Sequence, residues 1–563
     1  MTVEQTAPLR VYEAVARALV ADGVEAVFGL MGDDTAAMVV AIEGSGIAYH
    51  GARHENQAVA MADGYARVTR RVGIAPVPGG PGFSNALTAI NTARRASSGI
   101  VVIVGAGRSG EDDHDDAVVR AGSRVGWLKH LPQLAVCESI GIAALRPATA
   151  EDAVRDTRRA FARARRGETV VLILGRDVLG QEIDGGAVAR FAVPATGPGP
   201  APSHADVVAF ADLLQETWAV SRPVILAGRG ALASDAGPAL RRLGELTGAV
   251  LATTLRAPAL FAGDPFAIGM SGTYATSIGS ELLLQADCVL AFGASLNKFT
   301  THEHTLFPQA LVVHVDTDSG AIGRFVDAGL AIQADARLAA EAVVAELERR
   351  EHTTSGFRTP ELATRIAAFR PSDEVRDQST PDLIDARTLM LELDRILPAD
   401  RVLTIDAGHH SRFSIRYLRV ERPENFVQSV DGGSIGLGIG TAIGAAVGRP
   451  EATVVLGVGD AGLLMSIGDL ETAVRLNLPL IVIVSNDHAL GSEVKVLSEL
   501  GLPTDLAKIP APSFAAVATA LGAEGHTVTS VADLHRIADR LRVRPAGLLL
   551  LDCRVNPEVM IGF

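Results

Sequence analysis

The sequence is poor in cysteine and lysine. Its three cysteines, at positions 137, 288 and 553 of 563 residues, are too few and too far apart for a disulfide framework or a zinc site. Only four of its 51 basic residues are lysines, and its formal net charge is −14. Because nucleic acids and anionic membrane surfaces attract clustered cations, this composition argues against both as partners.

Long apolar runs are also missing. No stretch of about 18 uninterrupted apolar residues occurs, so no transmembrane helix is predicted. The first residues, MTVEQTAPLRVYEAV, lack the basic region and apolar run of a secretory signal. We therefore expect a cytoplasmic protein. Its length suffices for about three or four domains at roughly 150 residues each.

Short runs of β-branched and other apolar residues recur along the chain. Each run ends near Gly, Asp or Asn, and stretches with helical spacing lie between successive runs. Such continuous runs fit strands that are buried on both faces. The alternation predicts an α/β protein with doubly wound parallel sheets. The clearest runs are 99–107, 168–176, 222–230, 287–295, 311–318, 401–408, 452–462, 479–487 and 547–553.

Two segments interrupt this alternation. Residues 191–206 are rich in Pro and Gly, which is typical of a stiff linker. Residues 348–385 are charged and polar, with one short helical stretch. We therefore predict three domains, 1–190, 204–345 and 385–563. In open α/β sheets ligands bind beyond the carboxyl ends of the strands, so functional residues are expected there.

Two acidic residues follow successive strands of the third domain. Asp460 ends the first run, and Asp487 ends the next run 27 residues later, with one helical stretch between them. Carboxylates at converging strand ends suit Mg²⁺, whose octahedron diphosphate oxygens can complete. Gly459 and Gly462 would let backbone N–H groups approach a phosphate. The alternative interpretation is ordinary turn residues.

Two further segments have an unusual composition. Glu55 begins a predicted helix rich in small residues, where a carboxylate is favoured by the helix dipole; a solvated capping charge is the alternative. Residues 431–440 hold five glycines and leave a backbone that a ligand can touch, with close helix packing as the alternative. His409 and His410 precede this segment and are expected at a pocket entrance or on the surface.

The order and spacing of these motifs resemble the thiamine-diphosphate-dependent enzymes of the acetolactate synthase, 2-hydroxyacyl-CoA lyase and pyruvate decarboxylase-like family. The resemblance covers the whole chain and implies a pyrimidine-binding, a middle and a diphosphate-binding domain, in that order. The family's motif, Gly-Asp-Gly followed by Asn-Asn, reads Gly459-Asp460-Ala461 and Asn486-Asp487 here. Asp487 still offers a hard oxygen ligand, but it adds negative charge beside a diphosphate.

The resemblance also implies roles for individual residues. Glu55 would be the activating carboxylate, which hydrogen-bonds the pyrimidine ring so that its exocyclic nitrogen can take the thiazolium C2 proton. Ile435 would hold the cofactor bent. The cofactor-binding residues would be Gly433, Ile435, Gly459, Asp460, Ala461, Gly462, Asp487 and Ala489, and the Mg²⁺ ligands Asp460, Asp487 and the carbonyl of Ala489. Because the family builds each site from two subunits, we expect at least a homodimer, and a homotetramer as its assembled form.

Three acidic residues are candidates for proton transfer on the substrate. By resemblance, Asp33 stands where decarboxylases carry a catalytic Asp, and Asp34 where benzaldehyde lyase carries a His. Glu493 occupies a position that is acidic in some decarboxylases and hydroxyacyl-CoA lyases but apolar in acetolactate synthases; a solvated helix cap is the alternative. In the middle domain, the glycines of 228–230 leave open a nucleotide such as ADP, CoA or FAD, or none.

The implied function is a lyase or carboligase that makes or breaks a C–C bond next to a carbonyl. One donor is a 2-oxo acid, for decarboxylation or acetolactate synthase-like ligation. The other is a 2-hydroxyacyl-CoA, cleaved to formyl-CoA and an aldehyde or ketone. A non-catalytic scaffold homologue is the alternative from another class, supported by the changes at Ala461 and Asp487.

Overall fold

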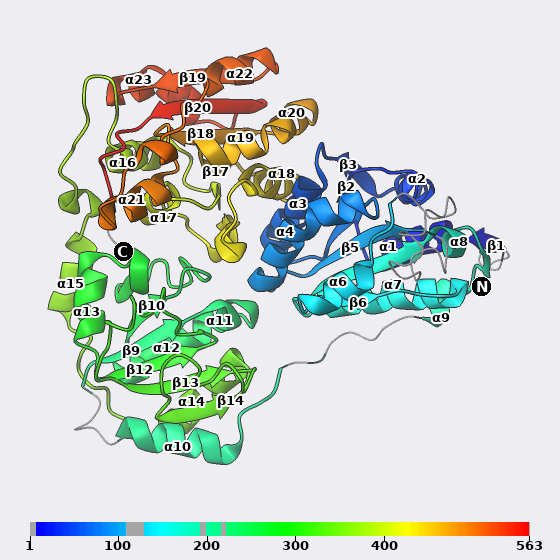
Figure 1. Cartoon of the computed structure of the whole chain (residues 1–563). Helices are drawn as coiled ribbons and strands as arrows, with labels where there is room; N and C mark the ends of the chain where they lie inside the picture. The colour runs from blue at the N-terminus through cyan, green and yellow to red at the C-terminus, as the bar shows by residue number, and fades with distance from the viewer. Residues whose placement is uncertain (1–6, 108–128, 192–196, 198, 216–220, 562–563) are drawn as a thin grey trace. The chain divides into compact units, whose positions relative to one another are not determined.

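The computed structural model of the chain describes residues 7–107, 129–191, 197, 199–215 and 221–561 (Figure 1). Contacts divide it into two compact units. Unit 1 consists of residues 1–196, 378–414 and 427–559, and unit 2 of residues 197–377, 415–426 and 560–563. The N-terminal and C-terminal parts of the chain therefore share unit 1, and the middle part forms most of unit 2.

The N-terminal part of unit 1 is built on parallel strands flanked by helices. A four-stranded sheet has the order β4-β5-β7-β6, and a smaller sheet pairs β2 with β3. The strands are β2 (Ala26–Gly29), β3 (Ala48–Gly51), β4 (Gly73–Val77), β5 (Ile100–Ala106), β6 (Ala143–Leu145) and β7 (Thr169–Gly175). The main helices are α1 (Val11–Ala21), α2 (Ala36–Gly44), α3 (Glu55–Thr69), α4 (Pro81–Ala96), α6 (Gln133–Ser139) and α7 (Ala150–Ala164). Shorter elements are β1 (Pro8–Arg10), which pairs antiparallel with β8 (Glu182–Asp184), and the helices α8 (Arg176–Leu179) and α9 (Ala187–Arg190).

The two sheets of this part meet at Pro76 in β4. The N–H of Leu30, just after β2, donates to the Pro76 carbonyl (3.3 Å), so β2 lies beside β4. Proline has no N–H to return, and a Cβ added at Gly29 would stand 2.8 Å from the Pro76 ring. Gly29 therefore makes room for the ring, and the hydrogen-bond ladder ends there.

The C-terminal part of unit 1 carries a six-stranded sheet of order β16-β15-β17-β18-β20-β19. From β15 to β19, neighbouring strands of this sheet are parallel. The strands are β15 (Val402–Ile405), β16 (Phe426–Gln428), β17 (Val454–Gly459), β18 (Leu480–Asn486), β19 (Glu524–Val528) and β20 (Leu548–Arg554). The helices are α16 (Ala386–Ile396), α17 (Ser411–Tyr417), α18 (Gly438–Gly448), α19 (Asp460–Met465), α20 (Ile467–Arg475), α21 (Gly491–Glu499), α22 (Phe514–Ala520), α23 (Val531–Arg536) and α24 (Ala538–Leu541).

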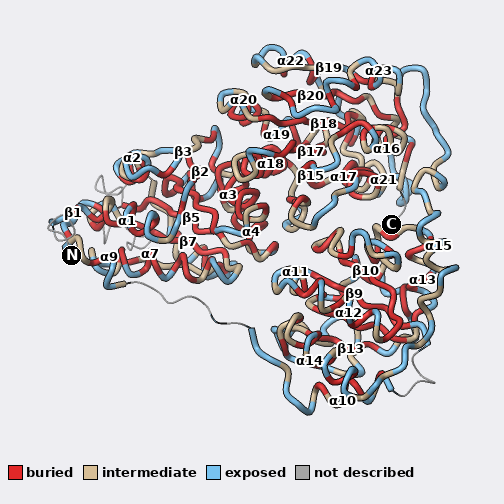
Figure 2. Tube along the Cα trace, turned by 180° about the vertical axis from the view of Figure 1, so that it is seen from behind, coloured by how far each residue is buried: buried red, intermediate tan, exposed pale blue. Residues whose placement is uncertain are grey.

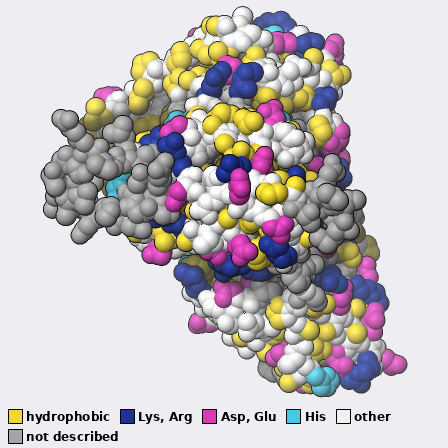
Figure 3. Space-filling model, turned by 90° about the vertical axis from the view of Figure 1, so that its right-hand side faces the viewer, with side chains coloured by type: hydrophobic (Ala, Val, Ile, Leu, Met, Phe, Trp, Pro, Cys, Tyr) yellow, Lys and Arg dark blue, Asp and Glu magenta, His cyan; other side chains and the backbone are white. Residues whose placement is uncertain are grey.

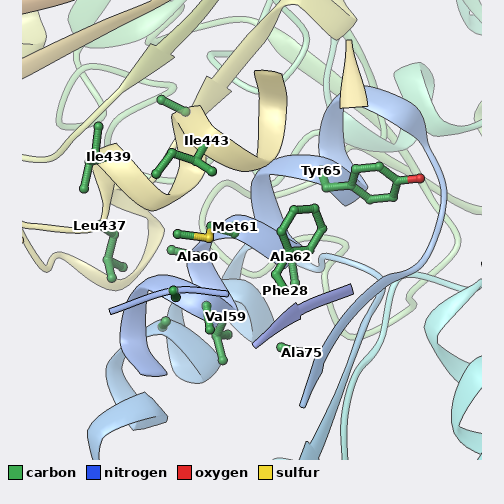
Figure 4. Packing of buried hydrophobic residues seen from close by; sticks show 14 of the residues in the cluster. Phe28, Val59, Ala60, Met61, Ala62, Tyr65, Ala75, Leu437, Ile439 and Ile443 are labelled. Atoms are coloured by element: carbon green, nitrogen blue, oxygen red, sulfur yellow. The ribbon is translucent and has the colours of Figure 1, made fainter. Parts of the chain in front are cut away.

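Helices α3 and α18 join the two parts of unit 1 through glycine contacts. A Cβ at Gly64 of α3 would lie 2.1 Å from the carbonyl oxygen of Thr441, and one at Gly444 of α18 would lie 1.8 Å from that of Met61. Only glycine permits backbones to approach this closely. Figure 4 shows side chains of both parts, among them those of Met61 and Ile443, packed in one core cluster.

Unit 2 is a third α/β domain with a parallel sheet of order β11-β10-β9-β12-β13-β14. The strands are β9 (Pro223–Ala227), β10 (Val250–Thr253), β11 (Ala267–Met270), β12 (Cys288–Phe292), β13 (Leu311–Asp316) and β14 (Leu330–Gln333). The helices are α10 (His204–Gln215), α11 (Arg229–Ala233), α12 (Gly237–Thr247), α13 (Ser277–Leu284), α14 (Ala336–Arg349) and α15 (Pro360–Ala368). The central strands β9 and β12 of this sheet are wholly buried, and β9 is drawn in red in Figure 2. The predicted fold class, three α/β domains with parallel sheets, is confirmed.

The surface carries charged side chains of both signs, as the composition suggests. On the face drawn in Figure 3, the coloured Lys and Arg side chains are interspersed with Asp and Glu. Within the described part of the chain, no helix has the length and apolarity needed to cross a membrane.

Candidate active site

The carboxyl edge of the C-terminal sheet brings two acidic side chains together. Strands β17 and β18 pair with Gly459 opposite Ser485, so Asp460 and Asp487 follow neighbouring strands. Asp460 begins α19 and is 4% exposed, and its Oδ1 accepts a hydrogen bond from the N–H of Ala461 (2.8 Å). This is the arrangement expected from the sequence.

Backbone N–H groups surround the two carboxylates. The N–H of Ala489 donates to Oδ1 of Asp487 (3.1 Å), and the backbone N–H groups of His488 and Ala489 lie where they favour the charged form of Asp460. Burial raises the pKa of Asp460 to about 6. Burial, followed by the charge of Asp460, raises the pKa of Asp487 to about 7. Ionising both groups together is therefore unfavourable unless a cation neutralises them.

These residues fit a hard divalent cation. The two carboxylates and the carbonyl of Ala489 are oxygen donors of the kind that Mg²⁺ prefers, with its other positions left to water and phosphate oxygens. No group of three or more His, Cys, Asp or Glu side chains in the described ranges could hold a metal on its own. The donor set therefore suits a metal that shares its coordination with a bound diphosphate.

The loop that carries two of these ligands, residues 487–490, is anchored by the following segment. The N–H of Ile509 donates to the carbonyl of His488 (2.8 Å), and the N–H of Ala511 donates to Nδ1 of the same residue (2.9 Å). His488 has a φ of 56°, a left-handed conformation that non-glycine residues rarely adopt. These hydrogen bonds therefore hold the loop in one conformation.

Asp406, which the sequence analysis did not single out, organises the glycine-rich segment. It follows β15 and is fully buried. Its Oδ2 accepts from the N–H of Gly436 (2.8 Å), and its Oδ1 from those of Leu437 and Gly438 (3.2 Å each) and from the Ser429 hydroxyl (3.0 Å). Burial raises the pKa of this carboxyl group. The sequence signal for this role is an acidic residue near the end of the apolar run 401–408.

The predicted cofactor contacts lie around this braced segment. Gly433 has a φ of 75°, and a Cβ there would meet no atom within 4 Å, so its backbone is open to a ligand. Ile435 is half-buried, with its Cγ2 3.8 Å from the Cβ position of Gly408. A Cβ at Gly462 would lie 2.5 Å from Oδ2 of Asp406, so this glycine is required by packing. The assigned cofactor roles remain predictions.

Glu55 lies at the carboxyl edge of the N-terminal sheets. It begins α3, is 9% exposed, and its Oε2 accepts a hydrogen bond from Nδ2 of Asn85 (3.1 Å). Its Oε1 lies 3.0 Å from the Cβ position of Gly82, at the start of α4. A carboxylate is thus held beside the end of β4, among neutral partners, as a general base or hydrogen-bond acceptor requires.

Gln57 is a second residue that sequence reasoning missed. It is buried on α3; its Nε2 donates to the carbonyl of Gly436 (2.6 Å), and its Oε1 accepts from the N–H of Gly440 (3.0 Å). Residues two apart on a helix point about 200° apart. Glu55 therefore faces away from the α18 helix that Gln57 contacts.

The adjacent residues Asp33 and Asp34 have different environments. Asp34 is 4% exposed, and its Oδ2 accepts from the N–H of Gly79 (2.8 Å), which ties the loops after β2 and β4 together. The side chain of Asp33 is 57% exposed and pairs with Lys129 and Arg176. The hydrogen bond from Lys129 is the main cause that lowers the pKa of Asp33. Of the two, Asp34 is the one enclosed at the sheet edge.

Other predicted positions are exposed or more deeply buried than expected. Glu493 lies in the first turn of α21 and is exposed. His409 and His410 are each 8% exposed, and burial lowers the pKa of both to about 4. The expectation that these histidines stand at an entrance or on the surface is therefore corrected: both rings are enclosed, and burial keeps them neutral.

In unit 2, the glycines at 228–230 are used in packing. The N–H of Gly228 donates to the carbonyl oxygen of Phe292, and the N–H of Gly230 donates to that of Gly293 (3.0 Å). A Cβ at Gly228 would lie 2.2 Å from the carbonyl oxygen of Gly293. The N–H groups of both glycines are thus already bonded to the last residue of β12 and the residue after it, which leaves neither for a phosphate.

The fold and the site define an α/β protein with a buried carboxylate, Glu55, at the edge of one group of strands and a pair of carboxylates, Asp460 and Asp487, at the edge of another. The chain belongs to the thiamine pyrophosphate enzymes. Its residues 9–132 match the N-terminal TPP binding domain of that family, residues 209–343 the central domain and residues 406–553 the C-terminal TPP binding domain. It is therefore a thiamine-diphosphate-dependent enzyme, and the predicted family is confirmed.

Curated relatives extend over most of the chain. A probable acetolactate synthase large subunit of Methanocaldococcus jannaschii is 29% identical over 85% of this chain and 80% of that protein. The acetolactate synthase isozyme 3 large subunit of Escherichia coli is 28% identical over 97% and 94%, respectively. A sulfoacetaldehyde acetyltransferase of Castellaniella defragrans is 28% identical over 97% and 91%. The chain is thus similar to acetolactate synthases and to an acetyltransferase.

Proposed function

We propose that this enzyme is an Mg²⁺-dependent lyase or carboligase that acts next to a carbonyl, with a 2-oxo acid as its donor. The observation that carries the proposal is the combination of a buried carboxylate, Glu55, with the paired carboxylates Asp460 and Asp487. The names of the acetolactate synthase relatives support joining a two-carbon acyl unit to a second carbonyl.

The residues of the chain supply positioning and proton chemistry. When bound, thiamine diphosphate supplies a nucleophilic carbon and stores the electrons released when a bond next to a carbonyl breaks. Asp460, Asp487 and the Ala489 carbonyl would hold its Mg²⁺. Glu55 would accept a hydrogen bond from the pyrimidine ring, which keeps the ring in its reactive tautomer. The backbone at Gly433, which precedes the segment that Asp406 holds, would orient that ring.

The donor 2-oxo acid would lose CO₂. The remaining acyl unit would then be protonated or would add to a second carbonyl. Asp34 is the enclosed acidic side chain at the N-terminal sheet edge and is our candidate for holding a proton there. Glu493, exposed on α21, supports the second candidate function, a 2-hydroxyacyl-CoA lyase, because an acid at this position would move the substrate hydroxyl proton.

The site would be completed by a second copy of the chain. Glu55 faces away from α18 of its own chain, on the side of α3 opposite Gln57. Several large apolar side chains beside the site are exposed and would be covered by association: Met465 is 67% exposed, Val496 51%, Leu500 66% and Leu506 93%. We propose a homodimer as the smallest active form and a homotetramer as the assembled one.

Product analysis tests the proposed reaction. The enzyme, saturated with thiamine diphosphate and Mg²⁺, is incubated with ¹³C-labelled pyruvate in one sample and with a short 2-hydroxyacyl-CoA in another, and products are identified by NMR. Labelled CO₂ with acetaldehyde or acetolactate supports the 2-oxo acid donor. Formyl-CoA from the second sample, with pyruvate unchanged, would replace that proposal by the lyase.

A further inference from the structure

The loop that leads into the helix of Glu55 is held by a carboxylate from the other part of unit 1. This loop, residues 51–53, joins β3 to α3. The N–H of Arg53, two positions before Glu55, donates to Oδ1 of Asp469 (2.8 Å), which lies in the first turn of α20. Helix α3 belongs to the N-terminal part of the unit and α20 to the C-terminal part. Asp469 therefore fastens the backbone that precedes Glu55 to the C-terminal part.

The contact made by Asp469 is buried and directed. Asp469 is 1% exposed, and its Oδ1 also accepts a hydrogen bond from the hydroxyl of Thr472 (2.9 Å), which fixes the direction of the carboxylate. By contrast, Nε of Arg53 and Oε2 of Glu471 join side chains that are 54% and 30% exposed. Exposed ion pairs contribute little, because water screens them. The contact with Asp469 is therefore the one suited to setting the position of the backbone.

A helix cap is the alternative interpretation of Asp469. An acidic side chain in the first turn is favoured by the positive end of its own helix. The N–H group that Asp469 accepts, however, is that of Arg53, 416 positions away in the sequence. Burial raises the pKa of this carboxyl group, so keeping it ionised here costs folding free energy, which a solvated cap would not do. Asp469 is therefore placed for the loop before α3 rather than for α20 alone.

The carboxylate of Glu55 takes its position from the start of α3. Its Oε2 accepts a hydrogen bond from Nδ2 of Asn85 (3.1 Å). The helix begins behind His54, whose Nδ1 accepts from the N–H of Asn56 (3.1 Å), and Arg53 directly precedes this cap. A shift of Arg53 would therefore move the first turn and its carboxylate together. Misplacing a catalytic group by about 1 Å can lower a rate by about 100-fold.

We propose that Asp469 is a positioning residue for Glu55: by holding the N–H of Arg53, it sets where α3 begins and where the Glu55 carboxylate stands. This inference rests on the proposed function, which gives Glu55 its role. Asp469 acts through the backbone and needs no contact with cofactor or substrate. Because its two donors, a backbone N–H and a hydroxyl, are neutral, the contact requires an acceptor oxygen rather than a charge.

Release of the C2 proton of bound thiamine diphosphate tests the inference, followed as deuterium exchange at saturating cofactor and Mg²⁺. We expect Asp469→Ala to exchange about 10- to 100-fold more slowly than the wild type, with unchanged cofactor affinity by calorimetry. Asp469→Asn, which keeps an acceptor oxygen, should retain most of the rate. Asp533→Ala is the matched control, because Asp533 also accepts backbone N–H and hydroxyl groups, at the start of α23 and outside the site. It should exchange like the wild type.

A second measurement needs no cofactor. Amide hydrogen exchange of the cofactor-free protein, read by mass spectrometry, reports on the peptide that contains Arg53. This peptide should exchange faster in Asp469→Ala than in the wild type, in Asp469→Asn or in Asp533→Ala, because only the first of these variants loses the acceptor of the Arg53 N–H. Equal protection in all four proteins would contradict the inference.

Combination with Glu55→Gln separates failure of this inference from failure of the proposed function. If Asp469 acts through Glu55, Asp469→Ala should slow C2 exchange no further in the Glu55→Gln background. A full further loss there, or wild-type exchange in Asp469→Ala alone, overturns the inference while the proposed function stands. If Glu55→Gln alone exchanges like the wild type, the proposed role of Glu55 is wrong and the inference falls with it.

A second variant covers the case in which Asp469→Ala does not fold. Thr472→Val keeps the shape of the side chain but removes the hydroxyl that directs the Asp469 carboxylate. Slower C2 exchange in this variant, with unchanged cofactor affinity, would support the inference. Exchange at the wild-type rate would contradict it.

Discussion

Asp487 is the residue at which this chain departs most clearly from its family's motif, and its surroundings explain how it is tolerated. Burial and the neighbouring Asp460 raise its pKa to about 7 from an ordinary value of 3.8. In the metal-free protein it can therefore carry a proton, which removes one of two opposed charges. A bound cation takes the place of that proton.

The metal-free protein should lose stability as the pH rises. Because the folded-state pKa values of Asp460 and Asp487 are raised to about 6 and 7, their protonated forms favour the folded state; that contribution is complete below about pH 4 and is lost as the pH rises through 6 and 7. Melting temperatures of the wild type and Asp487→Asn, each in EDTA, measure the effect. As the pH rises, the melting temperature of the wild type should fall relative to that of Asp487→Asn, and saturating Mg²⁺ should reverse this change. Parallel pH profiles for the two proteins would contradict the raised pKa of Asp487.

Removing the Asp406 carboxylate should damage both the fold and cofactor affinity. Asp406→Ala leaves three buried N–H groups, those of residues 436–438, without their acceptor, so we expect a loss of about 3 kcal/mol or more. Asp335→Ala is a matched control, since Asp335 accepts two N–H groups at the start of α14 in unit 2. It should cost about 1 kcal/mol and leave cofactor affinity intact. Denaturant unfolding and calorimetry measure both; equal effects of the two variants on cofactor binding would count against this role of Asp406.

At the scale of elements, the contact of α3 with α18 depends on two glycines. Gly444→Ala would place a methyl group 1.8 Å from the Met61 carbonyl oxygen, so the helices must move apart, at a cost of about 1–3 kcal/mol. Gly44→Ala is the control, because Gly44 is also helical, at the end of α2, and its Cβ would meet no atom within 4 Å. That change should be neutral or slightly stabilising. Thermal unfolding of the two variants should therefore differ clearly, and similar melting temperatures would show that the close approach is not required.

The elements also show what sequence patterns can predict. Buried strands appear in the sequence as apolar runs. The strands that precede Asp460 and Asp487, and the three α/β domains, could therefore be predicted. Asp406 and Gln57 could not, because their importance comes from backbone groups thirty or more residues away that only the folded chain brings near. The burial of His409 and His410 was missed for a similar reason: polar residues carry no local sign that the folded chain will enclose them.

At the scale of the whole molecule, the proposed site needs two chains. Glu55→Gln and Asp460→Asn are each expected to be inactive. Co-expressed, they should form mixed dimers in which one site of two receives Glu55 from one chain and Asp460 from the other. Random association would then restore about a quarter of wild-type activity. Two separately purified and unmixed variants are the control. No recovery in verified mixed dimers would contradict a site shared between chains.

The central claim, that Glu55 activates a bound thiamine diphosphate, can be tested without knowing the substrate. The measurement is the rate of hydrogen–deuterium exchange at the thiazolium C2 of the bound cofactor, by rapid quenching into acid and NMR, for the wild type, Glu55→Gln and the control Asp539→Asn, whose side chain is 96% exposed on α24. We expect exchange in the wild type and in Asp539→Asn to exceed that of free cofactor by at least about 100-fold, and Glu55→Gln to lose that acceleration while still binding cofactor. Exchange in the saturated wild-type enzyme at the rate of free cofactor, or equal rates in the wild type and Glu55→Gln, would contradict the account.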